Sequence, residues 1–559
     1  AWVMAGHKRG AAQGIVANRW ASSGMNAPES NLWNGAALWR AAAMFPDDPQ
    51  AAAWRAKARV FLVNSVCVPE DVGVVPGCVG GGFFSSYALD HHGYMNVGYM
   101  VICVSNAAIL HFDLKGQGLE RPAELDHHEA DLWGVLRRMI FADGRLARIG
   151  GDTRVRYAYC QEYLLPALLY AADQLGDAHA VELANRQLEL MAKEQRQNPD
   201  GSFYGKRLAE LARHNPYYYT RLESDRACVL GMALAYGDLV KAPARSRGGF
   251  EASAAGEWIE PEHGAVLSRC ATRLASFSWR AQGLGQGLCL PPDNGDLAEW
   301  EGNLTGKVVA ACHPAPPHVN RRLGGFTISS FGGGFVTCGK LIEGEKTWLN
   351  EGWAGADAAE HWIAFAALPD GHTVAGLELV RIGSRRTYLT ELQGLRLNVP
   401  NDLHAGFRRI LTSESGAYLL DGPARQDEIV ELRSRWACVE DRIAVLGLYG
   451  GDTLAVSRSS QRRGGMYHSL FTEEIGWPIM KETTAFDAGA VALDAGWAVA
   501  ASVDSGRARK WAGENASARL ELGGDLRGVM LRGLDGRDYA VVANFGSTAM
   551  KAVVAGAMS

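Results

Sequence analysis

Two patterns in the sequence predict an α+β chain whose helices and strands are segregated into separate domains. Up to about Val240, apolar residues recur at helical spacing in segments of similar length, whereas from about Ala265 apolar and polar residues alternate between glycine-rich turns. Runs of helices followed by runs of strands indicate separate domains. We expect an N-terminal α/α toroid of helical hairpins over residues 1–245, a linker over 246–264, and a C-terminal antiparallel β-sandwich over 265–559.

The helical part is divided by short links rich in glycine and aspartate, such as Asp143-Gly144 and Gly176-Asp177. Helices of similar length joined in this way are typical of stacked helical hairpins, and a toroid accommodates them better than a compact bundle. The expected helices are Asn31–Val66 with a break at Pro46, Tyr94–Phe112, Glu124–Ile140, Gln161–Leu175, Ala178–Lys193 and Arg226–Leu239.

The strand part is punctuated by turn pairs such as Gly450-Gly451 and Asp535-Gly536, which are typical of antiparallel hairpins. Period-two alternation between such turns predicts strands that bury one face. The expected strands are Phe326–Phe335, Thr387–Val399, Arg442–Tyr449, Trp497–Val503, Ala518–Leu522 and Tyr539–Asn544.

The composition is that of an ordinary globular protein, since the chain is 47% hydrophobic and 21% charged. Its net charge of −5 disfavours a general binder of nucleic acid or of membrane surfaces, because both classes are usually basic. The uncharged apolar stretch Gly93–Leu110 is about long enough to suggest a membrane span. It contains Asn96 and Asn106 and lacks a basic flank, so we expect a buried helix and no membrane insertion.

The ten cysteines are too few for a disulfide scaffold in a chain of this length. Cys67 and Cys78 bracket a loop rich in proline and glycine and could form a disulfide, whereas the other cysteines are scattered and are expected to be small core residues. No cysteine–histidine spacing typical of zinc is present, so we expect no metal site.

A first cluster of polar and aromatic residues lies within Asp90–Tyr99, where the apolar helix is expected to begin. Backbone NH groups and the helix dipole at such an end favour an anion. The alternative is a helix cap formed by Asp90, with the histidines and tyrosines packed in the core. The candidate functional side chains here are His91, His92, Tyr94, Asn96 and Tyr99.

A second cluster, Arg145–Tyr163, joins arginines, a Gly-Gly turn and tyrosines directly before a helix. Arginine is the natural bidentate partner of a carboxylate or sulfate, and it favours the phenolate form of a nearby tyrosine. The alternative is a solvated loop in which Asp152 and Glu162 are salt-bridge partners. The candidates are Arg154, Arg156, Tyr157 and Tyr159.

A third cluster, His214–Asp225, carries three consecutive tyrosines before a helix. Aromatic faces suit sugar rings and an arginine suits an acidic substituent, although the tyrosines could instead pack under a loop. Its candidates are Tyr218, Tyr219, Arg221 and Glu223. All three clusters fall where a helical hairpin begins, so in a toroid they would converge on one mouth. Aromatic platforms with arginines predict a cleft for acidic carbohydrate, even in a protein that is acidic overall.

Two of these segments resemble the heparinase II/III-like polysaccharide lyases, including alginate lyases with an α/α toroid and a β-sandwich. The stretch that begins Tyr159-Cys160-Gln161 resembles the catalytic-tyrosine segment of that family, although the family often has histidine where Cys160 stands. The stretch from His92 to Tyr99 resembles the helix whose Asn or His neutralises a uronate carboxylate.

The resemblance implies specific roles for these residues. Tyr159 would transfer the proton, with Tyr157 competing for that role, Asn96 would neutralise the carboxylate and His92 would assist. The family also has a histidine on its β-sandwich. Here that histidine could be His361, His372 or His404, and the sequence does not decide between them.

The implied reaction is β-elimination at a uronate, in which the weakly acidic C5 proton is removed and the leaving oxygen is protonated. Carboxylate neutralisation by protein donors makes a metal or other cofactor unnecessary. We expect an acidic polysaccharide as partner and a secreted or periplasmic location, given the size of such a substrate.

Two other functions compete with the lyase. A glycoside hydrolase on the same toroid needs a pair of carboxylic acids flanking the bond. That pair would come from Asp152, Glu162, Glu223 and Asp225. A non-catalytic glycan-binding protein would keep the aromatic residues but would not need the Tyr/His/Asn set.

Overall fold

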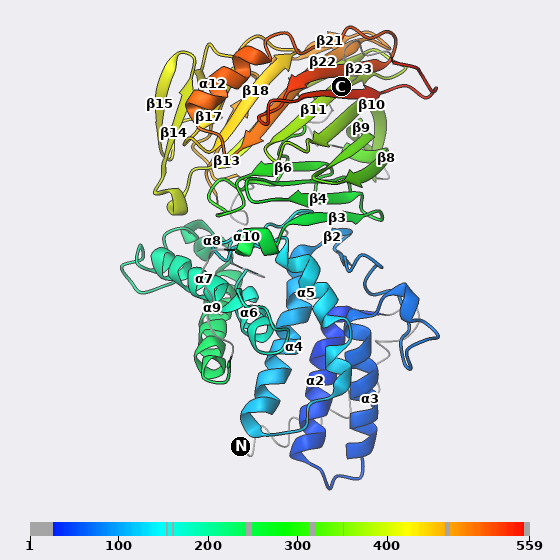
Figure 1. The fold of residues 1–559 in the computed structure, drawn as a ribbon, viewed down its shortest axis with the longest axis vertical. Helices are drawn as coiled ribbons and strands as arrows, with labels where there is room; N and C mark the ends of the chain where they lie inside the picture. Colours follow the sequence, from blue (N-terminus) through cyan, green and yellow to red (C-terminus); the bar gives the residue numbers. More distant parts are fainter. Residues whose placement is uncertain are drawn as a thin grey trace. The chain divides into compact units, whose positions relative to one another are not determined.

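The computed structural model describes residues 26–151, 155–158, 161–241, 249–311, 320–349, 352–463 and 470–552 (Figure 1). It divides into two compact units. The helical unit is Ala1–Arg148 with Asp152–Phe250, and the strand unit is Glu251–Ser559 with Ile149–Gly151. The prediction of a mixed chain with helices first and large sheets second is therefore confirmed.

The predicted helices are present in the described part of the helical unit, with Pro46 in the break between the first two. α9 differs from its prediction, because it begins ten residues before Arg226. Asn215 caps it by accepting from the Tyr218 NH, and a proline occupies its first turn. The helices are α2 (Pro28–Met44), α3 (Ala51–Val63), α4 (Val97–Gln117), α5 (Glu129–Arg137), α6 (Leu164–Asp173), α7 (Ala180–Gln195), α8 (Ala209–His214), α9 (Pro216–Gly237) and α10 (Phe250–Ser253).

α4 is the central apolar helix of the unit. It is long and apolar enough to cross a membrane, but 89% of its apolar window is buried in the structure, which is typical of a core helix. Asn96 caps its N-terminus, and Gly118 ends it with a left-handed φ of 62°. The sequence predicted this buried helix from its uncharged run and internal asparagines.

Three helices of this unit run in the same direction. The Tyr163 hydroxyl at the start of α6 bonds Asp225 in the middle of α9, and the Asp173 carboxylate at the end of α6 accepts from the Lys241 NH beyond the end of α9. α4 packs along α6, and the C-terminal half of α4 meets the last turn of α6, where its Lys115 bonds Asp173. The N-termini of α4, α6 and α9 therefore point to one end of the helical unit (Figure 1).

The strand unit is built on a nine-stranded antiparallel sheet in the order β15-β14-β17-β18-β22-β11-β10-β9-β8. Its strands are β8 (Asn320–Phe331), β9 (Gly334–Leu349), β10 (Gly352–Ala367), β11 (Thr373–Ile382), β14 (Arg408–Ser413), β15 (Gly416–Asp421), β17 (Trp436–Val439), β18 (Ile443–Tyr449) and β22 (Val491–Ala501).

Smaller sheets accompany it. One sheet has the order β3 (Gly256–Glu260), β4 (Ala265–Arg269), β5 (Leu274–Ser278), β6 (Gln286–Leu290), and another has the order β13 (Arg396–Pro400), β20 (Thr472–Gly476), β19 (Ala455–Arg458), β16 (Glu428–Glu431). A further sheet has the order β21 (Thr484–Phe486), β12 (Thr387–Gln393), β7 (Lys307–Ala310), and β23 (Leu526–Arg532) pairs with β24 (Asp538–Asn544).

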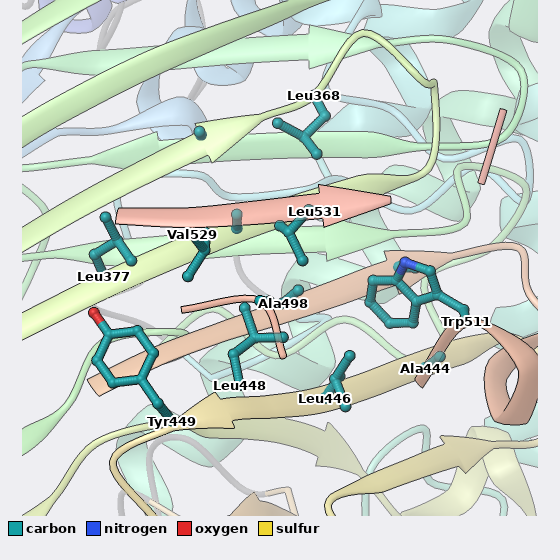
Figure 2. Packing of buried hydrophobic residues seen from close by; sticks show 14 of the residues in the cluster. Leu368, Leu377, Ala444, Leu446, Leu448, Tyr449, Ala498, Trp511, Val529 and Leu531 are labelled. Atoms are coloured by element: carbon teal, nitrogen blue, oxygen red, sulfur yellow. The ribbon is translucent and has the colours of Figure 1, made fainter. Parts of the chain in front are cut away.

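The large sheet is covered on both faces. On one face, Leu446 and Ala498 pack under Trp511 of α12 (Ser505–Glu514) and Val529 of β23 (Figure 2). On the other face, Phe365 of β10 lies 5.0 Å from Phe277 of β5, measured between ring centroids. The apolar side chains removed from water on the two faces account for the cohesion of the unit.

Several predicted boundaries are wrong. The segment predicted as one strand, Phe326–Phe335, is a hairpin, because Gly333 adopts a left-handed φ of 82° between β8 and β9. Residues 518–522 form no strand, only a bridge from Arg519 to Val529. Within the predicted linker 246–264, the described residues already contain α10 and β3.

Candidate functional site

The first cluster is a tight hairpin that leads into α4. β1 (Asp90–His91) pairs with β2 (Tyr94–Met95), and the two residues between them have φ values of 63° and 82°. A two-residue turn with both φ values positive matches the strand twist, and Gly93 adopts that geometry without a Cβ clash. Within this hairpin His92 is exposed, whereas Tyr94 and Asn96 are buried.

Asn96 joins the hairpin to the helix. Its Oδ1 accepts from the Tyr99 NH at 3.3 Å, and its Nδ2 donates to the Tyr94 hydroxyl at 3.2 Å. The cap uses the carbonyl oxygen of the side chain, so the amide NH₂ remains the donor group of this side chain. The alternative cap that the sequence offered, Asp90, is not the N-cap of α4.

The imidazole of His91 stacks on the Tyr99 ring with 3.5 Å between centroids, and His92 meets His91 edge-on at 4.3 Å. Glu29 of α2 approaches the same group, with its Oε1 3.5 Å from His91 Nε2. Burial alone would raise the pKa of Glu29, but His91 and the Glu29 backbone NH hold it below its usual range. A carboxylate therefore already lies beside His91.

The second cluster is held by local polar contacts. Arg145 bonds Asp143 within the turn, and its guanidinium lies 5.2 Å from the centroid of the Tyr157 ring. Gln161 connects the two ends of the segment, because its Oε1 accepts from the Leu146 NH and its Nε2 donates to the Gly144 carbonyl. Arg156 and Tyr157 are both buried.

The rest of this cluster is either outside the described residues or part of the strand unit. Asp152, Arg154, Tyr159 and Cys160 lie outside the described residues. The Gly-Gly turn belongs to the strand unit, where the Gly150 carbonyl accepts from the Gln282 NH at 2.7 Å.

Four buried charges form a chain of ion pairs next to this segment. Arg226 lies 2.7 Å from Glu162 and 3.0 Å from Glu194, and Arg207 bonds Glu194 at 2.5 Å. The Tyr204 hydroxyl donates to Glu162 at 2.6 Å. Burial would raise the pKa of Glu194, but Arg207 and Arg226 hold it below its usual range. The two positive and two negative charges compensate one another away from water.

This network also fixes the backbone of the candidate segment. Arg207 donates to the Arg156 carbonyl at 2.7 Å, and Arg226 donates to the Tyr157 carbonyl at 3.3 Å. Tyr157 has a φ of 56°, which a residue with a side chain rarely adopts. The network thus holds the strained turn that carries a candidate tyrosine.

The third cluster forms the first turns of α9 rather than a loop. Tyr218 is buried, and Tyr219 donates its hydroxyl to Glu223 at 2.7 Å. Burial and Glu223 raise the pKa of Tyr219 to about 12, so this phenol stays protonated near neutral pH. Arg221 is partly exposed and lies 3.7 Å from Asp225.

The carboxylates of the hydrolase alternative have structural partners. Glu162 belongs to the buried network, and Glu223 accepts from the backbone NH groups of Phe203 and Tyr204. Burial raises the pKa of Asp225, to which the Tyr163 hydroxyl donates. A pair of glycosidase acids must contact the substrate. The described members of the set do not favour that function.

The structure also describes the three candidate histidines of the strand unit. His361 is fully buried between Glu343 and Glu378, each 3.2 Å from one of its ring nitrogens. Asn96 is equally buried, so burial alone does not decide the predicted catalytic role of His361, which stays a prediction. His372 lies 2.8 Å from the Ala501 carbonyl, and His404 is half-buried.

Sequence reasoning missed the buried network, because its members are spread over α7, α9 and the turns before α6 and α8. One signal was available in α7. Its buried face repeats at helical spacing and includes two polar residues, Gln187 and Glu194. A polar side chain on an apolar helix face indicates a buried partner.

The fold is similar to that of a xanthan lyase from Paenibacillus, with a TM-score of 0.50 and 12% sequence identity over 91% of this chain and 47% of the other. A heparinase III (TM-score 0.41, 10% identity, 96% of this chain and 69% of that one) and a mutant of the heparan sulfate lyase HepC from Pedobacter heparinus (0.43, 7%, 96% and 69%) are also matched.

The chain thus spans about half the length of the xanthan lyase, and at this identity the likeness concerns the fold. No family model matches the chain, and no curated protein matches its sequence. The resemblance to polysaccharide lyases that the sequence predicted is confirmed at the level of the fold.

Proposed function

We propose that this chain is a polysaccharide lyase that cleaves an acidic, uronate-containing polysaccharide by β-elimination, on an α/α toroid followed by a β-sandwich. The observation that carries the proposal is the common direction of α4, α6 and α9. The His91–Tyr99 hairpin leads into the N-terminal end of α4, Arg156 and Tyr157 precede that of α6, and Arg221 lies near that of α9. Three positive helix ends and these arginines favour an anionic substrate there.

In the proposed reaction a tyrosinate removes the C5 proton of the uronate. The electron pair of that bond forms the C4–C5 double bond, the C4–O bond breaks, and a tyrosine or histidine donates a proton to the leaving oxygen. Tyr159 is the first candidate for the phenol. Tyr157, which the arginine network holds in place, is the second.

Neutralisation of the uronate carboxylate is assigned to Asn96 and the arginines, with His92 assisting. The amide NH₂ of Asn96 is the donor, since its oxygen caps α4. Because Asn96 is fully buried, direct contact with a uronate requires the residues that cover it to move. His92, which is exposed, is placed to meet the substrate first.

The deciding experiment incubates the full chain with a panel of uronate polysaccharides, including xanthan and heparan sulfate, and follows ultraviolet absorbance and reducing ends together. A lyase produces both signals, because elimination creates a double bond conjugated with the carboxylate. New reducing ends without absorbance would replace this proposal by the hydrolase. Binding without either signal would indicate a glycan-binding protein. A polymeric substrate also leads us to propose action outside the cytoplasm.

A further inference from the structure

Five side chains with metal-ligating atoms meet in the helical unit, away from the residues assigned above. The candidate ligand atoms of Cys67, Asp71 and Cys78 lie within 4.8 Å of one another, and those of Asp71, His127 and His128 do so as well. The first three come from the loop after α3, and the two histidines directly precede α5. Asp71 belongs to both groups and links the two segments.

The distances from His127 to its two neighbours are close to those between ligands of a small tetrahedral site. His127 Nε2 lies 3.1 Å from Asp71 Oδ2 and 3.9 Å from Cys78 Sγ. A zinc ion with bonds of about 2.3 Å to sulfur and about 2.0 Å to nitrogen or oxygen places neighbouring ligand atoms about 3.3–3.8 Å apart. Two thiols, an imidazole and a carboxylate are ligand types that zinc accepts in proteins.

His128 orients the shared carboxylate rather than completing the same set. Its Nε2 lies 3.0 Å from Asp71 Oδ1, and its Nδ1 lies 2.9 Å from Asp131 and 3.1 Å from the Tyr87 hydroxyl. Hydrogen bonds of this kind fix the direction of a ligating carboxylate.

The loop that carries the cysteines is held by Asn64, which donates to the Gly77 carbonyl and accepts from the Val79 NH, and a metal ion would add to these hydrogen bonds. Val72 and Val74 are 50% and 77% exposed, so they contribute little burial. The regular structure described between Asn64 and Leu89 consists of short 3₁₀ turns and one bridge. The same loop leads directly into the hairpin of His91 and His92. Cys67 and Cys78 are free thiols in the structure, not the disulfide considered from the sequence.

We propose that Cys67, Asp71, Cys78 and His127 bind one Zn²⁺ ion, with His128 positioning Asp71. The site has four protein ligands and no open position, which is typical of structural zinc. The ion would join the loop after α3 to the start of α5 and so fix the approach to the candidate hairpin. This inference does not depend on the proposed lyase activity.

The test measures metal in the full chain, purified under reducing conditions without chelator. We expect about one zinc per chain by elemental analysis, and, after exchange for Co²⁺, thiolate-to-cobalt charge-transfer absorption. Cys78→Ser and His127→Ala should lose the metal. His128→Ala should bind zinc about 10–100-fold more weakly with unchanged stoichiometry. Cys228→Ser, which removes an exposed cysteine on α9, is the matched control and should retain the ion.

The wild-type chain alone can overturn the proposal, whatever the variants do. No binding in a Zn²⁺ titration against a chromophoric chelator would overturn it, as would a Cys67–Cys78 disulfide found by peptide mapping of the freshly purified chain. Retention of the metal by a folded Cys78→Ser/His127→Ala double variant would place it elsewhere. Metal content is read without any substrate, so these outcomes are separate from a failure of the lyase proposal.

Discussion

The helical unit and the strand unit each bury a network of opposite charges, but the two networks differ in what surrounds them. In the helical unit, Arg226 and Arg207 pair with two glutamates and also donate to the backbone of a candidate segment. In the strand unit, His361 lies between Glu343 and Glu378. There the outer partners are Arg321, which bonds Glu343, and the indole of Trp497, which bonds Glu378.

The difference teaches that a buried titratable group indicates function through its neighbours. The helical network ends on the carbonyls of a strained turn, so it acts on the position of Tyr157. The strand network ends on the indole of Trp497 and, through Arg321, on the carbonyls of Leu284 and Gly306, none of which belongs to a candidate segment, so it acts on the packing of the strand unit. Shifted pKa values are typical of active sites, but structural ion pairs shift pKa values as well.

The largest effect is expected from breaking the helical network. Arg226→Met leaves Glu162 and Glu194 buried without their shared partner, and such a loss costs about 3–5 kcal/mol in the free energy of unfolding. Denaturant unfolding followed by helical circular dichroism measures it. Arg186→Ala removes an exposed arginine that also bonds two glutamates, and it should change nothing measurable. A loss below about 1 kcal/mol for Arg226→Met would show that the two kinds of pair are equivalent.

The next effect concerns the turn that the network supports. Tyr159→Phe deletes only a hydroxyl and should lower kcat by about a hundredfold or more, while KM and the unfolding temperature stay nearly constant. Tyr157→Phe is the matched variant on the same segment. If Tyr157→Phe is inactive and Tyr159→Phe is not, the assignment moves to Tyr157. Full activity of both would remove the phenol from the mechanism.

Much of the fold was predictable because its elements are encoded locally. The uncharged run of α4, with Asn96 at its start, predicted a buried helix with a polar end. The start of α9 was missed, since Tyr217, Tyr218 and Tyr219 are aromatic residues with no helical period of their own. What determines that start is the Asn215-Pro216 pair, a cap followed by a proline in the first turn.

The contacts within the sites were less predictable because they depend on tertiary structure. Glu343 and Glu378 flank His361 because their strands pair with β10 in a register that places Leu341 and Val380 opposite it. No local pattern specifies that register. The same reason hid the cluster of cysteines and histidines, whose two segments are about fifty residues apart in the chain.

A smaller effect should distinguish the strand network, since it contains a histidine. Burial would lower the pKa of His361, but Glu343 and Glu378 raise it above its usual value. A pKa raised on folding contributes stability that is present below the unfolded value of about 6.5 and is lost as the pH rises through the folded value.

His361→Gln should therefore reduce the free energy of unfolding more at about pH 6 than at about pH 9, because the stabilisation is lost as the pH rises through the folded pKa. The measurement is denaturant unfolding of both chains at the two pH values. His214→Gln, at an exposed position in α8, is the control and should show no such dependence. An equal loss at both pH values would mean that His361 is neutral in the folded chain.

The smallest effect on folding is expected where the charges are exposed. The side chain of Arg221 is 42% exposed and lies 3.7 Å from Asp225, and exposed pairs of this kind contribute about 0–1 kcal/mol. Arg221→Ala should leave the unfolding temperature unchanged yet raise KM for a polyuronate severalfold, because an exposed guanidinium can pair with an acidic substituent. The salt dependence of KM should weaken as well, since one screened charge interaction is lost. Arg55→Ala, on the exposed face of α3, should leave both unchanged. If Arg221→Ala instead lowers the unfolding temperature without altering KM, this arginine has a structural role. The proposed anion-binding end of the helical unit would then not include Arg221.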